Sequence, residues 1–146
     1  MTPKELETVF RKICRFDETL AINFTVPKPG TSHYKFTVDE RHLASPTQCH
    51  GGVLAAVMDA TMGVAVLTEA VQSGNLCSTV EFKINYLNRA VLGDQLDAYG
   101  EVEFIGNRLI VANAVIKCGE KLIAKAMGTF SPYPADKTEI ANWAKG

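Results

Sequence analysis

The stretch that decides the fold runs from His50 to Leu67 and reads HGGVLAAVMDATMGVAVL. Its alanines, leucines and methionines favour an α-helix, and its apolar residues lie on nearly every face of that helix. In a soluble protein such a helix must be enclosed by other elements. A helix of about 20 residues is about 30 Å long. The rest of the chain must therefore supply a cover of comparable length.

Strand-like segments flank this helix on both sides. In these segments apolar residues alternate with polar ones, which is typical of β-strands with one buried face. The segments lie at 34–38, 80–86, 96–104, 108–117 and 121–130. A turn signal, Cys118-Gly119-Glu120, separates the last two. One strand, one long helix and four further antiparallel strands predict an α+β fold in which a curled sheet wraps around a central helix.

The two ends of the chain carry weaker signals. A capping hydroxyl on Thr2, proline at the next position and a carboxylate in the first turn predict a helix over about residues 3–15. The polar residues 136–146 predict a loose tail or a short surface helix. Since no repeat, low-complexity tract or long linker divides the chain, we expect one domain over 1–146 with its core at about 31–131.

The composition indicates a soluble globular protein and argues against two classes of partner. Of its 146 residues 47% are apolar and 21% are charged, and the formal net charge is −1. Without a broad basic field, the chain is not expected to bind nucleic acid or an anionic membrane surface. The longest apolar stretch, from Val53 to Leu67, is shorter than the roughly 20 residues that cross a bilayer, and it contains Asp59. We therefore expect no membrane span.

The cysteines and histidines favour neither a disulfide framework nor a metal site. The cysteines are Cys14, Cys49, Cys77 and Cys118. They form no CxxC pair and the N-terminus lacks a secretion signal, so we expect free thiols in a reducing cytoplasm. Cys49 precedes His50, but neighbours at a helix start seldom align as a nucleophilic pair, and a packed thiol is expected. His33 and His42 lack a cluster at metal-ligand spacing, so no metal is expected.

Asp59 is the residue of the central helix that most needs an explanation. Burying a carboxylate among apolar side chains is costly, and a buried acid usually has a partner or a catalytic task. The alternative is that Asp59 lies on the one face of the helix that meets solvent. Its neighbours, which include Val57, Met58 and Met62, leave little polar surface nearby.

His50-Gly51-Gly52 opens the same helix. The first backbone N–H groups of a helix have no internal partner, and the helix dipole adds partial positive charge there. Two glycines let a ligand approach that backbone closely. Such an end can polarise a carbonyl and hold the oxyanion that develops under attack. The alternative is that the glycines only serve a tight turn.

The spacing of these two features predicts a homodimer. Asp59 follows Gly51 by eight positions, or about 12 Å along the helix axis. Reacting atoms must come within about 3–3.5 Å of each other. One helix cannot meet that requirement, whereas two antiparallel copies related by a two-fold axis can. We therefore expect two equivalent sites across the interface of a homodimer, alone or within a dimer of dimers.

The order of motifs resembles that of the hotdog-fold acyl-CoA thioesterases, in the branch typified by the phenylacetate-pathway enzyme (PaaI-like). HGG is followed nine residues after its histidine by Asp59. Residues 86–90, YLNRA, are similar to the family's Y-L-x-P-A strand end, and Gly93-Asp94 follows. Gly106-Asn107-Arg108 precedes the penultimate strand. The likeness covers about residues 31–131 and implies a single hotdog domain.

The resemblance implies a role for each of four residues. Asp59 would act as general base on water or as nucleophile toward the thioester carbonyl. The N–H of Gly51 would polarise that carbonyl, and His50 would line the site. Thr79 would position the water. Strict strand alternation instead places Thr79 with Glu81 on the solvent face, as an ordinary strand residue.

Two positions depart from the family pattern. Many members carry Asn or Gln six residues before the histidine, where this chain has Ala44, and Gln48 is a candidate substitute. Arg89 replaces the proline of Y-L-x-P-A. With Arg108 it could meet a CoA phosphate, although exposed surface arginines are the ordinary expectation. Gly52 completes the expected substrate-binding set.

The predicted function is hydrolysis of an acyl-CoA to a free acid and CoA, with CoA as part of the substrate and no other cofactor. A hotdog hydratase or dehydratase is the second hypothesis. The third is a non-catalytic acyl-CoA-binding module, which the missing polar group at Ala44 makes credible. The sequence leaves the acyl group open.

Overall fold

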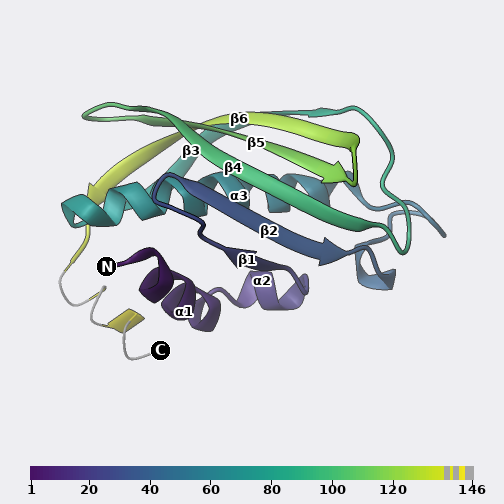
Figure 1. Ribbon diagram of the computed structural model, residues 1–146, viewed down its shortest axis with the longest axis horizontal. Coiled ribbons are helices and arrows are strands. Elements are labelled where there is room, and N and C mark those ends of the chain that lie inside the picture. The colour runs from purple at the N-terminus through teal and green to yellow at the C-terminus, as the bar shows by residue number, and fades with distance from the viewer. Residues whose placement is uncertain (137–138, 140–141, 144–146) are drawn as a thin grey trace.

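The long central helix forms as predicted. The computed structural model describes residues 1–136, 139 and 142–143. Helix α3 spans Gly51–Ala70, with His50 at its N-cap. It is long and apolar enough to cross a membrane by length and composition, but it packs lengthwise against the sheet and more than half of it is buried (Figure 1). Helix α3 is therefore the core helix of the domain.

Six antiparallel strands form one sheet that curls over α3. They are β1 (Asn23–Thr25), β2 (Thr31–Thr37), β3 (Asn75–Tyr86), β4 (Gln95–Ile105), β5 (Ile110–Cys118) and β6 (Lys121–Pro134). Their order in the sheet is β1-β2-β4-β5-β6-β3. Short 3-10 helices occur at Glu40–His42 and Val71–Ser73. This is the predicted hotdog architecture, with β1 as an additional edge strand that the alternation did not predict.

Packing between α3 and the sheet forms the main core. Val57, Met58 and Met62 of α3 are completely buried, as are Ala112 and Ile116 of β5. The two methionines therefore fill the core. Burying side chains of this size stabilises the fold by about 1.5–3 kcal/mol each.

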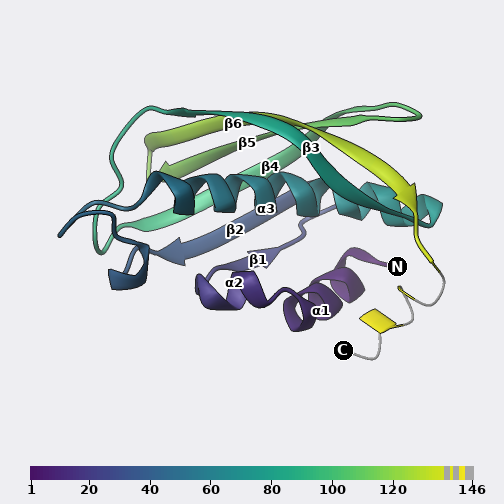
Figure 2. The same ribbon diagram turned by 180° about the vertical axis from the view of Figure 1, so that it is seen from behind.

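The predicted N-terminal helix is broken into two. Helix α1 spans Pro3–Ile13 and begins with the predicted capping box at Thr2. Cys14 has a non-helical backbone conformation, and the short helix α2 follows at Arg15–Thr19. Figure 2 shows α1 and α2 along one side of α3 and strand β3 along the other. Most of the predicted tail at 136–146 lies outside the described residues.

Strand β3 is an edge strand with an irregular register. It pairs with β6 along its length, and the register shifts between Thr79 and Glu81. Its other edge has no partner strand among the described residues. Val80, at the irregularity, is 57% exposed. A long edge of this kind is a ready template for pairing with another chain.

Candidate active site

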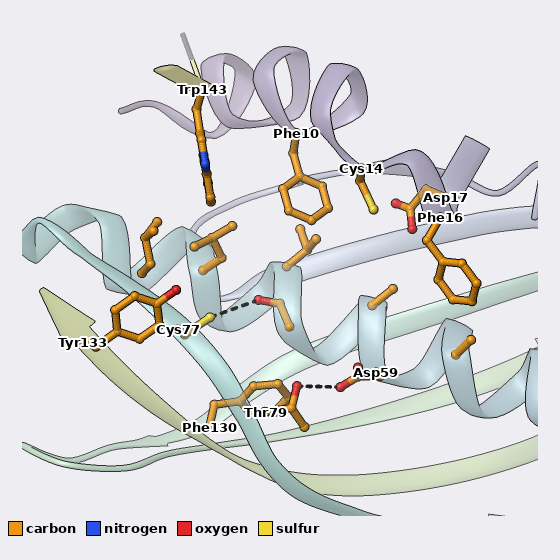
Figure 3. Close-up of a pocket in the computed structure, with 16 residues that line it drawn as sticks. Phe10, Cys14, Phe16, Asp17, Asp59, Cys77, Thr79, Phe130, Tyr133 and Trp143 are labelled. Carbon is orange, nitrogen blue, oxygen red and sulfur yellow. Dashed lines mark hydrogen bonds between the residues drawn. The ribbon is translucent and has the colours of Figure 1, made fainter. Parts of the chain in front are cut away.

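Asp59 and Thr79 meet between α3 and β3. The Thr79 hydroxyl donates a hydrogen bond of 2.7 Å to Oδ1 of Asp59 (Figure 3). Asp59 is half-buried and lines a cavity, so it is neither sealed in the core nor turned to open solvent. The register shift after Thr79 explains its orientation, because one extra residue reverses the alternation. Thr79 therefore faces α3, although both it and Glu81 are exposed to solvent.

The N-terminus of α3 leaves one amide available. Nδ1 of His50 accepts a 2.7 Å hydrogen bond from the N–H of Gly52. The N–H of Gly51 has no acceptor among the described residues. The His50 ring thus caps its own helix, and Gly51 retains the donor that could bind an external oxygen.

Tyr86 fixes the first turn of α3. Its hydroxyl donates a 2.8 Å hydrogen bond to the carbonyl oxygen of Gly51. A Cβ at Gly51 would lie 3.3 Å from the Tyr86 ring, so glycine suits this contact. The strand period predicts that Tyr86 and Phe104 lie in the core. Both expectations are wrong, because these side chains are 52% and 59% exposed and lie near the ends of their strands. The Y-L-x-x-A motif was the available signal for Tyr86.

The two halves of the candidate site are separate within one chain. Thr79 of β3 contacts Asp59 midway along α3, whereas Tyr86 of β3 contacts Gly51 at the start of α3. Asp59 and Gly51 are eight helical positions apart, about 12 Å along the axis. A single reacting carbonyl cannot contact both groups of one protomer.

The candidate substrate-binding residues also separate. Gln48 forms a β-bridge with Val91 close to the start of α3, and its side chain is exposed. Arg89 is in the same region, where its carbonyl accepts from Lys121. Arg108 lies at the β4–β5 turn, at the other end of β5. The nine residues of β5 span about 30 Å, so Arg89 and Arg108 of one protomer cannot hold one phosphate together.

An apolar cavity of about 370 Å³ adjoins Asp59 and Thr79. It lies between α1 and α2 on one side and β3 on the other, with α3 as its floor (Figure 3). The aromatic residues in its lining are Phe10, Phe16, Phe130, Tyr133 and Trp143. No pattern in the sequence indicates this grouping, because it joins residues from both ends of the chain.

The thiols near the site are poor nucleophiles. Burial, with the charge of Asp59 adding to it, raises the pKa of Cys77 to about 12. Burial and then the charge of Asp94 raise the pKa of Cys49 to about 11. Both thiols stay protonated at neutral pH. Among the described residues, no group of three or more His, Cys, Asp or Glu side chains is arranged to hold a metal ion.

Comparisons with known proteins agree with this architecture. Residues 48–125 match the thioesterase superfamily. A protein of Pseudomonas aeruginosa named "Putative esterase PA0474" is 30% identical over 93 residues, which are 64% of this chain and 69% of that protein.

Solved structures extend the likeness over nearly the whole chain. The PaaI protein from the phenylacetic acid degradation operon of E. coli superposes with a TM-score of 0.83 at 19% identity, covering 92% of this chain and 98% of that one. A Streptococcus mutans protein bound to acetyl-CoA gives a TM-score of 0.70 at 22% identity, covering 80% and 91%. The motif order, the fold and the match over 48–125 together establish that this chain belongs to the thioesterase superfamily and has the hotdog fold.

Proposed function

We propose that this protein is an acyl-CoA thioesterase that hydrolyses a CoA thioester to a free acid and CoA. The observation that carries the proposal is the Asp59 carboxylate, held by Thr79 at the edge of an apolar cavity. Family membership makes thioester hydrolysis the expected chemistry. The acetyl-CoA bound to the S. mutans protein supports CoA esters as the substrate class.

Asp59 acts as general base on water or as nucleophile on the carbonyl carbon. The Thr79 hydroxyl occupies Oδ1, which leaves Oδ2 to accept a proton from water or to attack. On the general-base route water adds to the carbonyl carbon and gives its proton to Asp59, which later protonates the leaving thiolate; on the nucleophilic route Asp59 displaces CoA to form an anhydride, which water then hydrolyses to the free acid and the carboxylate. On either route the N–H of Gly51 from the partner stabilises the oxyanion. The C–S bond then breaks, and the CoA thiolate leaves and takes up a proton.

The geometry of α3 and β3 supports one particular arrangement for the dimer that this mechanism requires. Tyr86 contacts Gly51 and Thr79 contacts Asp59, so β3 and α3 run side by side in opposite directions. A two-fold axis that brings the partner's Gly51 beside Asp59 also sets the partner's Tyr86 opposite Thr79. The axis crosses β3 midway between Thr79 and Tyr86. Because of the bulge between Thr79 and Glu81, Val80 is not counted as a separate position, and the midpoint is Lys83. The two β3 edges then pair, which removes both unpaired edges.

The remaining substrate contacts follow from this dimer. Arg89 and Gln48 lie beside the start of α3 and are available to the polar part of CoA. Arg108 reaches the same ligand only if it comes from another protomer. The same contacts are available in an isolated dimer and in a dimer of dimers. We propose that the enzyme is cytoplasmic, in keeping with its free thiols.

The test is steady-state hydrolysis across an acyl-CoA panel. Asp59→Asn and Asp59→Ala are expected to lower kcat/KM by at least about 100-fold, because the base or nucleophile is lost. The matched control is Asp97→Asn, which removes a half-buried carboxylate that binds His33 on the other face of the sheet. Full activity in either Asp59 variant would refute the mechanism. Enoyl-CoA hydration, or saturable binding without turnover, would favour the hydratase or the binding module.

A further inference from the structure

We infer that the acyl group accepted by this site is neutral, apolar and of medium size, and that it lies in the cavity between α1, α3 and β3. The inference rests on the proposed thioesterase function. It adds the substrate class, which that function alone leaves open.

The floor of the cavity is a row of small residues on α3. Ala56, Ala60 and Gly63 line it at helical spacing around Asp59. Leu67 lines it two turns beyond Asp59, about 12 Å along the axis. An acyl chain whose carbonyl meets Asp59 can therefore extend along α3 toward the C-terminal end of that helix.

The roof is aromatic and comes from outside the segment that matches the family. Phe10 of α1 and Trp143 near the C-terminus pack edge to face, with ring centroids 6.4 Å apart. Phe16 of α2 continues the same wall (Figure 3). The family match covers residues 48–125, so these three side chains are additions to the matched region. The acyl preference is thus determined by the ends of the chain.

The volume sets the size class. An apolar cavity of about 150 Å³ accepts one benzene molecule. The cavity here, at about 370 Å³, has room for somewhat more than twice that. Octanoyl and phenylacetyl groups fit this space, whereas an acetyl group leaves most of it unfilled.

The charge of the lining sets the polarity class. Asp17 and Asp59 are the only Asp, Glu, Lys, Arg or His side chains among its sixteen lining residues. No Lys, Arg or His is among them. Asp17 is buried and accepts a hydrogen bond from Tyr34, and burial raises the pKa of its carboxyl. A dicarboxylic acyl group would place a second carboxylate here without a counter-ion, which is strongly unfavourable.

The first experiment compares kcat/KM for acyl-CoAs that differ in length or charge. From acetyl through butanoyl to octanoyl, kcat/KM is expected to rise about fourfold per methylene until the cavity is filled. Phenylacetyl-CoA is expected among the good substrates. Adipoyl-CoA, which has the length of hexanoyl-CoA and an added carboxylate, is expected to be at least about 100-fold poorer. Equal rates for hexanoyl- and adipoyl-CoA would overturn the inference.

The second experiment changes the cavity wall. Gly63→Leu fills the cavity one turn from Asp59 and is expected to lower the octanoyl-to-acetyl ratio of kcat/KM by about tenfold or more. A Cβ at Gly63 lies 3.8 Å from Phe130, an ordinary contact. Tyr133→Arg, at a side chain 39% exposed, adds a cation and is expected to raise the adipoyl-to-hexanoyl ratio.

A third pair of variants covers the case in which Gly63→Leu does not fold. Phe16→Ala removes an aromatic that is 58% exposed, and it is expected to lower the octanoyl-to-acetyl ratio several-fold. Phe104→Ala, at 59% exposure outside the cavity, is the control and leaves the ratio unchanged.

The outcomes separate the inference from the proposed function. Hydrolysis of no acyl-CoA would refute the proposed function. Hydrolysis that depends on Asp59, with ratios unaffected by Phe16→Ala and Tyr133→Arg, would leave the function standing and refute the acyl site.

Discussion

The hydroxyl of Thr79 donates a 2.7 Å hydrogen bond to Oδ1 of Asp59, and in the proposed mechanism this leaves Oδ2 to react. Thr79→Val keeps the shape of the side chain but removes this donor. We expect kcat to fall by about 10–100-fold, because an unoriented carboxylate positions water poorly. Thr79→Ser retains the donor and is expected to recover most of the rate. Measuring kcat and KM separately checks this, and a change in KM alone would argue against a positioning role.

At this scale the sequence predicted the candidate residues but not the orientation of their side chains. The pair of Asp59 with the HGG segment could be derived from burial cost and helix-end amides. The orientation of Thr79 could not, because a β-bulge reverses the alternation and leaves no composition signal. The sequence also could not predict that His50 caps Gly52, since a cap depends on a side-chain rotamer.

At the scale of elements, Asp17 links α2 to the sheet by accepting a 3.0 Å hydrogen bond from Tyr34 of β2. Burial raises the pKa of this carboxyl, so the folded protein binds its proton more tightly than the unfolded protein does. The free energy of unfolding therefore falls as the pH rises from the ordinary pKa of a carboxyl group through the raised pKa of Asp17 in the folded protein. Asp17→Asn removes this penalty and keeps an oxygen that can accept from Tyr34. We expect the Tm of the variant, relative to wild type, to increase from pH 4 to pH 7. A constant difference would show that Asp17 carries no such penalty.

Strand β3 gives the second prediction at this scale. In the proposed dimer, Lys83 lies opposite its own copy, so Lys83→Cys is expected to form a disulfide-linked dimer under mild oxidation. Lys125→Cys is the control, because strand β6 is paired with β3 on one edge and with β5 on the other and so cannot pair with a second chain. Denaturing gels without reductant, compared with wild type as background, distinguish the two. Equal cross-linking of both variants would contradict the register.

The elements themselves were largely predictable. The long apolar helix and four alternating segments predicted α3 and β3–β6, because their periods are strong over many residues. Strand β1 has three residues, too few to show a period. The residues on both sides of Cys14 favour a helix, so the helical spacing of apolar residues could not locate the break between α1 and α2.

At the scale of the whole molecule, the proposed hydrolysis requires a site shared between two chains. Each protomer contributes one Asp59 and one Gly51, and these lie about 12 Å apart along α3. The sequence could predict this requirement from helix geometry. It could not predict the aromatic cavity, because Phe10 and Trp143 meet only after the chain has folded.

Mixing two inactive variants tests the shared site most directly. Asp59→Asn removes the carboxylate. Gly51→Pro removes one N–H at a helix position that favours proline, after a residue with a compatible backbone, and the Tyr86 ring, 3.3 Å from the added Cβ, must shift by a few tenths of an ångström. In a mixed dimer one site lacks both groups and the other has Asp59 from one chain and Gly51 from its partner. After subunit exchange, verified by native mass spectrometry, we expect the mixture to recover about a quarter of wild-type hydrolysis. An exchanged mixture as inactive as its parents would contradict the account.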